Sequence, residues 1–190
     1  SVEGVLIPSA WVQSAVNAHR KLGFEPTGTR RGALDVADQG ADLNAFGSAR
    51  GVLLEYAQAW SGKGDDIFGT VETAFFQADI LGLDEFDYDS DGLGAGVRGD
   101  ARVLNERREA AGVAPIEARP WRGSGAVVNP DAPIPTARAS ESSDRVERTN
   151  GDFFKNAKAQ GWWALRVRFQ RTHRAVTGED TEYDPDDRSE

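Results

Sequence analysis

The alternation of apolar and polar positions along the chain predicts a succession of helices and strands. Apolar residues recur at the three- and four-residue intervals of a helix face over residues 8–22, 67–80, 101–111 and 151–174. Short apolar runs predict strands over residues 32–37, 44–49, 51–59, 83–89 and 113–119. Three strands followed by alternating helices and strands indicate an α/β domain, with a mixed sheet flanked by helices.

The last predicted helix, residues 151–174, is amphipathic. Trp162, Leu165 and Phe169 fall on one face at helical spacing, and arginines occupy the opposite face. We therefore expect this helix to pack these apolar side chains against the sheet, with Trp163 also in the core, and to leave its arginines in water.

Two stretches lack such a pattern. Residues 120–145 are rich in proline, glycine, serine and alanine, which predicts a long irregular excursion, either an exposed hairpin or a mobile loop. The segment 177–190 is acidic and is expected to be a disordered tail or the start of a further element. We therefore predict one domain over residues 1–176, followed by this acidic segment.

The composition narrows the possible chemistry of a chain of 190 residues. The absence of cysteine excludes disulfides, thiolate zinc sites and a thiol nucleophile. His19 and His173 are too few for a multi-histidine metal site, so oxygen atoms are the remaining metal ligands. No apolar run approaches the roughly 18 residues of a membrane span. The absence of methionine indicates a piece of a longer protein.

Charge is distributed unevenly along the chain. The net charge of −9 argues against an indiscriminate nucleic-acid binder but leaves room for a local basic patch. Residues 30–91 contain 13 acidic and 4 basic side chains, whereas residues 145–174 contain 8 basic and 2 acidic ones. Such segregation is common on solvated surfaces. It also suits a metal-dependent enzyme acting on a polyanion, in which carboxylates hold cations and a basic face holds phosphate.

Two acids stand at the ends of predicted strands. Asp35 interrupts the apolar run 32–37, and Asp89 ends the run 83–89. A carboxylate in a buried strand is costly unless it is paired or binds a cation, and Mg²⁺ and Mn²⁺ prefer carboxylate and water oxygens. If the strands are neighbours, both acids reach the same ions, with Asp91 as an outer ligand. Alternatively, both acids face solvent or cap helices. The other nearby acids are expected in loops: Asp38, Asp42, Asp84 and Asp87.

A glycine-rich run, residues 92–99, follows the Asp89 strand. Its position between a strand and a helix is that of a dinucleotide-binding loop, but no ribose-binding acid follows about 20 residues further on. We expect instead that the glycines let a helix pack close to Asp89.

Five runs of the sequence, taken in order, resemble one known family. They are residues 4–12 (GVLIPSAWV), 33–44 (ALDVADQGADLN), 88–100 (YDSDGLGAGVRGD), 156–166 (NAKAQGWWALR) and 183–187 (YDPDD). Together they resemble the nuclease domain of the large terminase subunit of tailed phages, over nearly the whole chain.

The resemblance implies a ribonuclease-H-like fold and a metal-dependent endonuclease. Such an enzyme cuts concatemeric double-stranded DNA during genome packaging, by two-metal hydrolysis with Mg²⁺ or Mn²⁺. By the same resemblance, Asp35 bridges the two ions and Asp89 ligates one of them. The family's third acid comes from a segment expected beyond Glu190, so the chain by itself is expected to lack it.

The resemblance also gives the basic helix a candidate role. Lys158, Arg168 and Arg171 could contact DNA phosphates, which need positive charge but no base-specific geometry. The alternative is that these side chains are only the solvated face of an amphipathic helix.

The partners that the resemblance implies lie outside this chain. No phosphate-binding loop of a nucleotide-driven motor is found, because the segment SGKG at Ser61 lacks the required spacing. The ATPase domain of the same protein is therefore expected upstream. The portal and the small terminase subunit are the other expected partners, with no membrane involved, in the cytoplasm of the bacterial host.

Two other functions remain open on the sequence. One is another ribonuclease-H-like nuclease, such as a resolvase or a transposase-like enzyme, because one fold hosts many activities. The other is a non-catalytic packaging module that docks on the portal or the motor.

Overall fold

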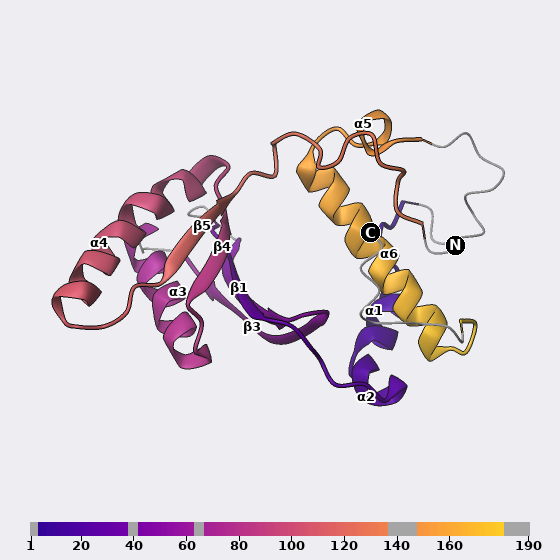
Figure 1. Cartoon of the computed structure of the whole chain (residues 1–190), viewed down its shortest axis with the longest axis horizontal. Coiled ribbons are helices and arrows are strands. Elements are labelled where there is room, and N and C mark those ends of the chain that lie inside the picture. The colour runs from indigo at the N-terminus through magenta and orange to yellow at the C-terminus, as the bar shows by residue number, and fades with distance from the viewer. Residues whose placement is uncertain (1–3, 38–41, 63–66, 137–147, 181–190) are drawn as a thin grey trace. The chain divides into compact units, whose positions relative to one another are not determined.

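The computed structural model describes residues 4–37, 42–62, 67–136 and 148–180. They form two compact units (Figure 1). The sheet unit comprises Pro26–Gly123, and the helical unit comprises Ser1–Glu25 together with Ser124–Glu190. Among the described helices, none is long and apolar enough to cross a membrane. The predicted segment 177–190 is described only as far as residue 180, so the predicted domain boundary stays a prediction.

A five-stranded mixed sheet forms the centre of the sheet unit. Its strands are β1 (Arg30–Asp35), β2 (Leu43–Arg50), β3 (Leu53–Ser61), β4 (Glu85–Asp89) and β5 (Glu117–Trp121). Their order in the sheet is β3-β2-β1-β4-β5. The hairpins β1–β2 and β2–β3 are antiparallel, whereas β4 lies parallel to both β1 and β5. The predicted α/β class and all five predicted strands are confirmed, with boundaries shifted by a few residues.

Helices α3 (Ile67–Leu81) and α4 (Val97–Ala110) cover one face of this sheet, as Figure 1 shows. Phe86 on β4 is the centre of the core, with the Phe46 and Phe75 rings edge-on at 5.7 Å each. The contact is close enough to require glycine at position 32, where a Cβ atom would lie 2.8 Å from the Phe86 Cβ. The helix face of the sheet is therefore tightly packed.

The opposite face of β1 and β4, called here the carboxylate face, carries the acids. Side chains alternate along a strand, so the burial of Leu34 and Tyr88 in the core directs their neighbours to this face. The acids of this face are Asp35, Glu85, Asp87 and Asp89. All four lie on two adjacent strands.

Four helices lie in the described part of the helical unit. They are α1 (Ser9–Ala15), α2 (Ala18–Leu22), α5 (Asn150–Phe153) and α6 (Ala157–Val176). Helix α1 packs on α6 through Trp11, whose ring lies under the Arg166 guanidinium at 4.9 Å and 6.4 Å from the His173 ring. The Ser14 hydroxyl and the His173 Nδ1 atom are joined by a 2.7 Å hydrogen bond. These contacts fix which face of α6 is buried.

Two helices predicted as continuous are broken. The first, residues 8–22, is interrupted at Asn17, which adopts a left-handed conformation (φ 55°) that asparagine tolerates better than most residues. The other, residues 151–174, is interrupted at Phe154, which is extended, and α6 begins anew with the Asn156 side chain accepting the Ala159 amide. The left-handed backbone at Asn17 sets the first break, and side-chain capping by Asn156 sets the start of α6.

The predicted buried face of the last helix is wrong for Trp162 and Leu165, whereas Phe169 is half-buried. Trp162 is 52% exposed and Leu165 is 39% exposed, while α6 buries Val167, Ala175 and also Arg174, which was expected in water. The packing of α1 selects this face. Trp163 is half-buried beside the Phe153 ring at 5.2 Å, so its expected place in a core is supported.

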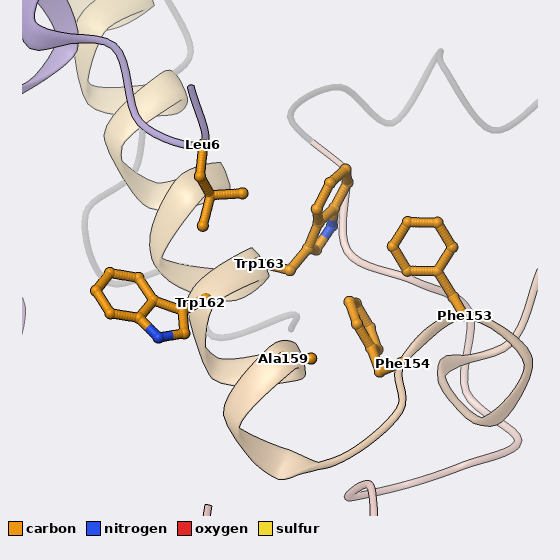
Figure 2. Close-up of a pocket in the computed structure, with 6 residues that line it drawn as sticks. All are labelled: Leu6, Phe153, Phe154, Ala159, Trp162 and Trp163. Carbon is orange, nitrogen blue, oxygen red and sulfur yellow. The ribbon is translucent and has the colours of Figure 1, made fainter. Parts of the chain in front are cut away.

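An apolar groove lies beside this aromatic cluster. It has a volume of about 580 Å³ and is lined by Leu6, Phe153, Phe154, Ala159, Trp162 and Trp163. Figure 2 shows these side chains gathered around the first turns of α6.

The predicted irregular stretch, residues 120–145, is confirmed where the structure describes it. Beyond the end of β5, residues 122–136 form no helix, and their one strand-like contact is an isolated bridge between Pro133 and Thr149. The remainder of the prediction, residues 137–145, lies outside the described part of the chain.

Candidate metal centre

The two predicted acids stand at the same end of neighbouring parallel strands. Leu34 pairs with Tyr88, and the next residues along the two strands are Asp35 and Asp89. Adjacent strands are about 4.8 Å apart, so the two carboxylates emerge side by side on the carboxylate face. The expectation that the two strands are neighbours is confirmed.

The backbone after β4 holds the Asp89 side chain. Its Oδ1 atom accepts a hydrogen bond of 3.0 Å from the Asp91 backbone amide, which begins the 3₁₀ helix η1 (Gly92–Gly96). Within η1, Gly94 approaches so closely that a Cβ atom there would lie 1.7 Å from the Asp89 carbonyl oxygen. A glycine does allow a close approach here, but η1 makes it, and to the Asp89 backbone carbonyl; packing of the predicted helix near the carboxylate stays a prediction.

The backbone after β1 is held by Asn44, which is fully buried. Its Oδ1 atom accepts a 2.9 Å hydrogen bond from the Ala37 amide, and its Nδ2 atom donates to the Thr70 hydroxyl at 3.1 Å. Asn44 therefore ties the chain just beyond Asp35 to helix α3. Asp35 itself is exposed.

We expect Asn44→Ala to lower the free energy of unfolding by about 1–3 kcal/mol, because a buried amide and a buried hydroxyl lose their partner. Urea unfolding followed by circular dichroism measures this change. Leu43→Ala, at an exposed neighbouring position, is the matched control and should change stability by less than about 0.5 kcal/mol. Equal losses in the two variants would contradict this role of Asn44.

Sequence reasoning missed two acids of the carboxylate face, Glu85 and Asp87. Asp87 was expected in a loop, but it lies within β4, where it pairs with Arg119 of β5. The signal in the sequence was the every-second-residue spacing of Glu85, Asp87 and Asp89, which places all three on one side of a strand. Asp42 and Asp84 are exposed outside strands as expected, and Asp38 lies outside the described residues.

The charges around β4 affect two neighbouring groups. The hydrogen bond to Asp87 raises the pKa of Arg119 above its usual value, with smaller contributions from nearby acids. Burial raises the pKa of the Tyr88 phenol, and the positive charge of Arg98 offsets part of that rise. A neutral, buried phenol therefore underlies the strand end that presents Asp89.

The predicted basic residues belong to the other unit. Lys158 and Arg168 are exposed on α6, and Arg171 on the same helix is half-buried. Asp91, predicted as an outer ligand, is half-buried at the start of η1. The structure thus brings together Asp35, Asp89 and the Asp91 backbone in the sheet unit.

The donor atoms at this site suit a hard divalent cation. Asp35 and Asp89 offer neighbouring carboxylate oxygens, the ligand type that Mg²⁺ and Mn²⁺ prefer. Within the described ranges, no group of three or more acidic, histidine or cysteine side chains is arranged to hold a metal ion. The two aspartates therefore fit as part of a coordination sphere that needs further oxygen ligands.

Comparisons with known proteins give one consistent result. No family model and no curated protein matches the chain. Among solved structures, the nuclease domain of the large terminase subunit gp2 of bacterial virus Sf6 matches with 30% identity and a TM-score of 0.74. A point variant of that domain with manganese and beta-thujaplicinol matches with 31% identity and a TM-score of 0.75. A variant with calcium matches with 32% identity and a TM-score of 0.75.

These matches extend over almost the whole molecule. Each covers 96% of this chain and 71% of the viral domain. The shared fold includes the mixed sheet whose β1 and β4 carry Asp35 and Asp89. The predicted ribonuclease-H-like fold and the predicted endonuclease class are confirmed. The chain belongs to the nuclease domains of bacteriophage large terminase subunits.

Proposed function

We propose that this domain cuts double-stranded DNA during genome packaging, with Mg²⁺ or Mn²⁺ held by Asp35 and Asp89. The observation that carries this proposal is the juxtaposition of the two aspartates at one end of adjacent parallel strands. It is supported by the related viral domain, which was solved with manganese and with calcium.

The chain's own residues would hold and place the reacting groups. Asp35 and Asp89 would hold the ions, with Asp35 shared between them, while the Asp91 amide holds the Oδ1 atom of Asp89 in place. Such ions would supply an activated water and stabilise the leaving oxygen of a phosphodiester. Asp91 itself is proposed as an outer ligand. A third acid, predicted beyond residue 190, would complete the set.

The residues next to Asp35 within the sheet are small. Its partner across β1 and β2 is Ala45, and the next pair on the same face is Ala33 with Gly47. These side chains are too small to keep a phosphate backbone away from the carboxylate. Within the sheet unit, these small neighbours are compatible with a phosphate group reaching the Asp35 carboxylate.

The wider packaging context is also proposed. Lys158, Arg168 and Arg171 would contact phosphates, which adds affinity without base recognition. An ATPase domain in the same protein would drive the DNA, with the portal and the small terminase subunit as partners in the host cytoplasm.

Calorimetric titration with Mn²⁺ tests the metal site. We expect saturable binding to the wild-type chain, and a loss of that binding in Asp35→Asn and in Asp89→Asn, because each substitution removes an anionic ligand. Asp84→Asn, an exposed acid at the other end of β4, is the matched control and should bind like the wild type. Undiminished binding in both site variants would contradict the proposed centre and favour a docking module.

A further inference from the structure

The carboxylate face holds more acids than the proposed centre uses. Glu85, Asp87 and Asp89 occupy alternate positions of β4 and so project from the same side of the sheet. Neighbouring members of this row are roughly 6.6–6.8 Å apart at their Cα atoms, by the rise of a strand. A row of carboxylates at that spacing would attract cations along its whole length, not only at Asp89.

One arginine from the next strand forms ion pairs with two of the three acids. Arg119 on β5 pairs with Asp87 in the sheet register. Its Nε atom donates to the Asp87 Oδ1 at 3.0 Å, and its Nη1 atom lies 2.8 Å from the Glu85 Oε2. The fork of the guanidinium thus contacts both carboxylates at once and places its positive charge between them.

The positive charge of Arg119 beside Asp87 and Glu85 is permanent at physiological pH. An arginine keeps its charge throughout the physiological pH range, and the hydrogen bond to Asp87 raises its pKa further. The Arg119 and Glu85 side chains are 32% exposed and that of Asp87 is 41% exposed, so the ions of the solvent can reach them. Exposed ion pairs of this kind add little to stability, which leaves the arrangement of charge as its main consequence.

We propose that Arg119 is a positioning residue that confines divalent cations to the Asp35–Asp89 end of the carboxylate face. By pairing with Glu85 and Asp87, it keeps any cation beyond those of the proposed centre from binding at these two acids. It also offsets the negative charge of Asp87, two residues before Asp89, so that Asp89 meets less like-charge repulsion. This inference rests on the proposed metal centre at Asp35 and Asp89.

The number of bound Mn²⁺ ions, counted from the loss of the free-ion signal in electron paramagnetic resonance, tests this role. We expect Arg119→Gln to bind one further Mn²⁺ per chain than the wild type. The additional ion should disappear in Arg119→Gln combined with Asp87→Asn, and should remain when Arg119→Gln is combined with Asp35→Asn. A merely structural role of Arg119 would not create a new ion site.

Two further variants serve as controls. Arg119→Lys keeps a positive charge between the acids and should retain the wild-type count. Arg102→Gln removes an exposed arginine of α4 whose partner Glu106 lies 3.9 Å away, and it should also leave the count unchanged. A gain of an ion in Arg102→Gln would show that any lost surface arginine has this effect, and would overturn the inference.

The outcomes separate this inference from the function on which it rests. If Asp35→Asn binds Mn²⁺ as the wild type does, the proposed metal centre fails. If Asp35→Asn loses its ion but folded Arg119→Gln gains none, only the role of Arg119 fails. If Arg119→Gln does not fold, the double variant Arg119→Gln with Glu85→Gln is tested instead, because it has the same net charge as the wild type and still leaves Asp87 without its arginine. The additional Mn²⁺ is expected in this double variant. Its absence would overturn the inference.

Discussion

Replacing Asp35 by asparagine in the complete large subunit is expected to abolish DNA cleavage while the fold survives. Asparagine has nearly the shape of aspartate, and position 35 is exposed at the end of β1, so packing is not disturbed. The substitution removes the anionic oxygen that would bridge the ions. Changes to the outer partners of metal ligands already cost about 10–100-fold, so losing a ligand should cost at least about 100-fold in cleavage rate.

Conversion of supercoiled plasmid to linear DNA in the presence of Mn²⁺ measures this rate. Circular dichroism and thermal unfolding of the same protein show whether the fold is retained. Asp84→Asn again serves as the matched control, because it removes one exposed acid of the same unit at the opposite end of β4. A cutting rate in Asp35→Asn equal to that of the control would contradict the assignment of Asp35 as a metal ligand.

The strands that carry the site could be predicted because their apolar runs are local signals. Asp35 and Asp89 stand out in the sequence since each follows residues that are buried in the core, Leu34 and Tyr88. Their adjacency depends on β1 and β4 being parallel neighbours, which is a property of the whole sheet. The resemblance to a known family supplied that step, because spacing alone also allowed solvent-facing acids.

Other features depend on contacts between residues far apart in the chain and have no local signal. The ion pair of Arg119 with Asp87 joins positions 32 residues apart, so neither residue by itself indicates it. The buried face of α6 was predicted wrongly for the same reason. Helical periodicity indicated a single apolar face, whereas the contacts of Trp11 with Arg166 and His173 show that α1 packs on another side of the helix.

The glycine-rich run brings η1 against the backbone of Asp89, and a substitution in this run is the second large effect that we expect. Gly94→Ala should destabilise the sheet unit by about 1–3 kcal/mol and weaken Mn²⁺ binding. A Cβ atom at position 94 would lie 1.7 Å from the carbonyl oxygen of Asp89 and 2.8 Å from its carbonyl carbon. Backbone atoms cannot rotate away as a side chain can, so the strand end itself must shift, at the cost typical of an overpacked site.

The control for this prediction is another glycine of the same segment. A Cβ atom at Gly99, in the first turns of α4, would meet nothing within 4 Å. Gly99→Ala should therefore raise helix stability by about 0.5–1 kcal/mol and leave Mn²⁺ binding unchanged. Thermal unfolding and Mn²⁺ titration of both variants separate the two cases. If Gly94→Ala matched Gly99→Ala in both measurements, the Asp89 carboxylate would not depend on the close approach of η1, and the fold would position this acid through β4 alone.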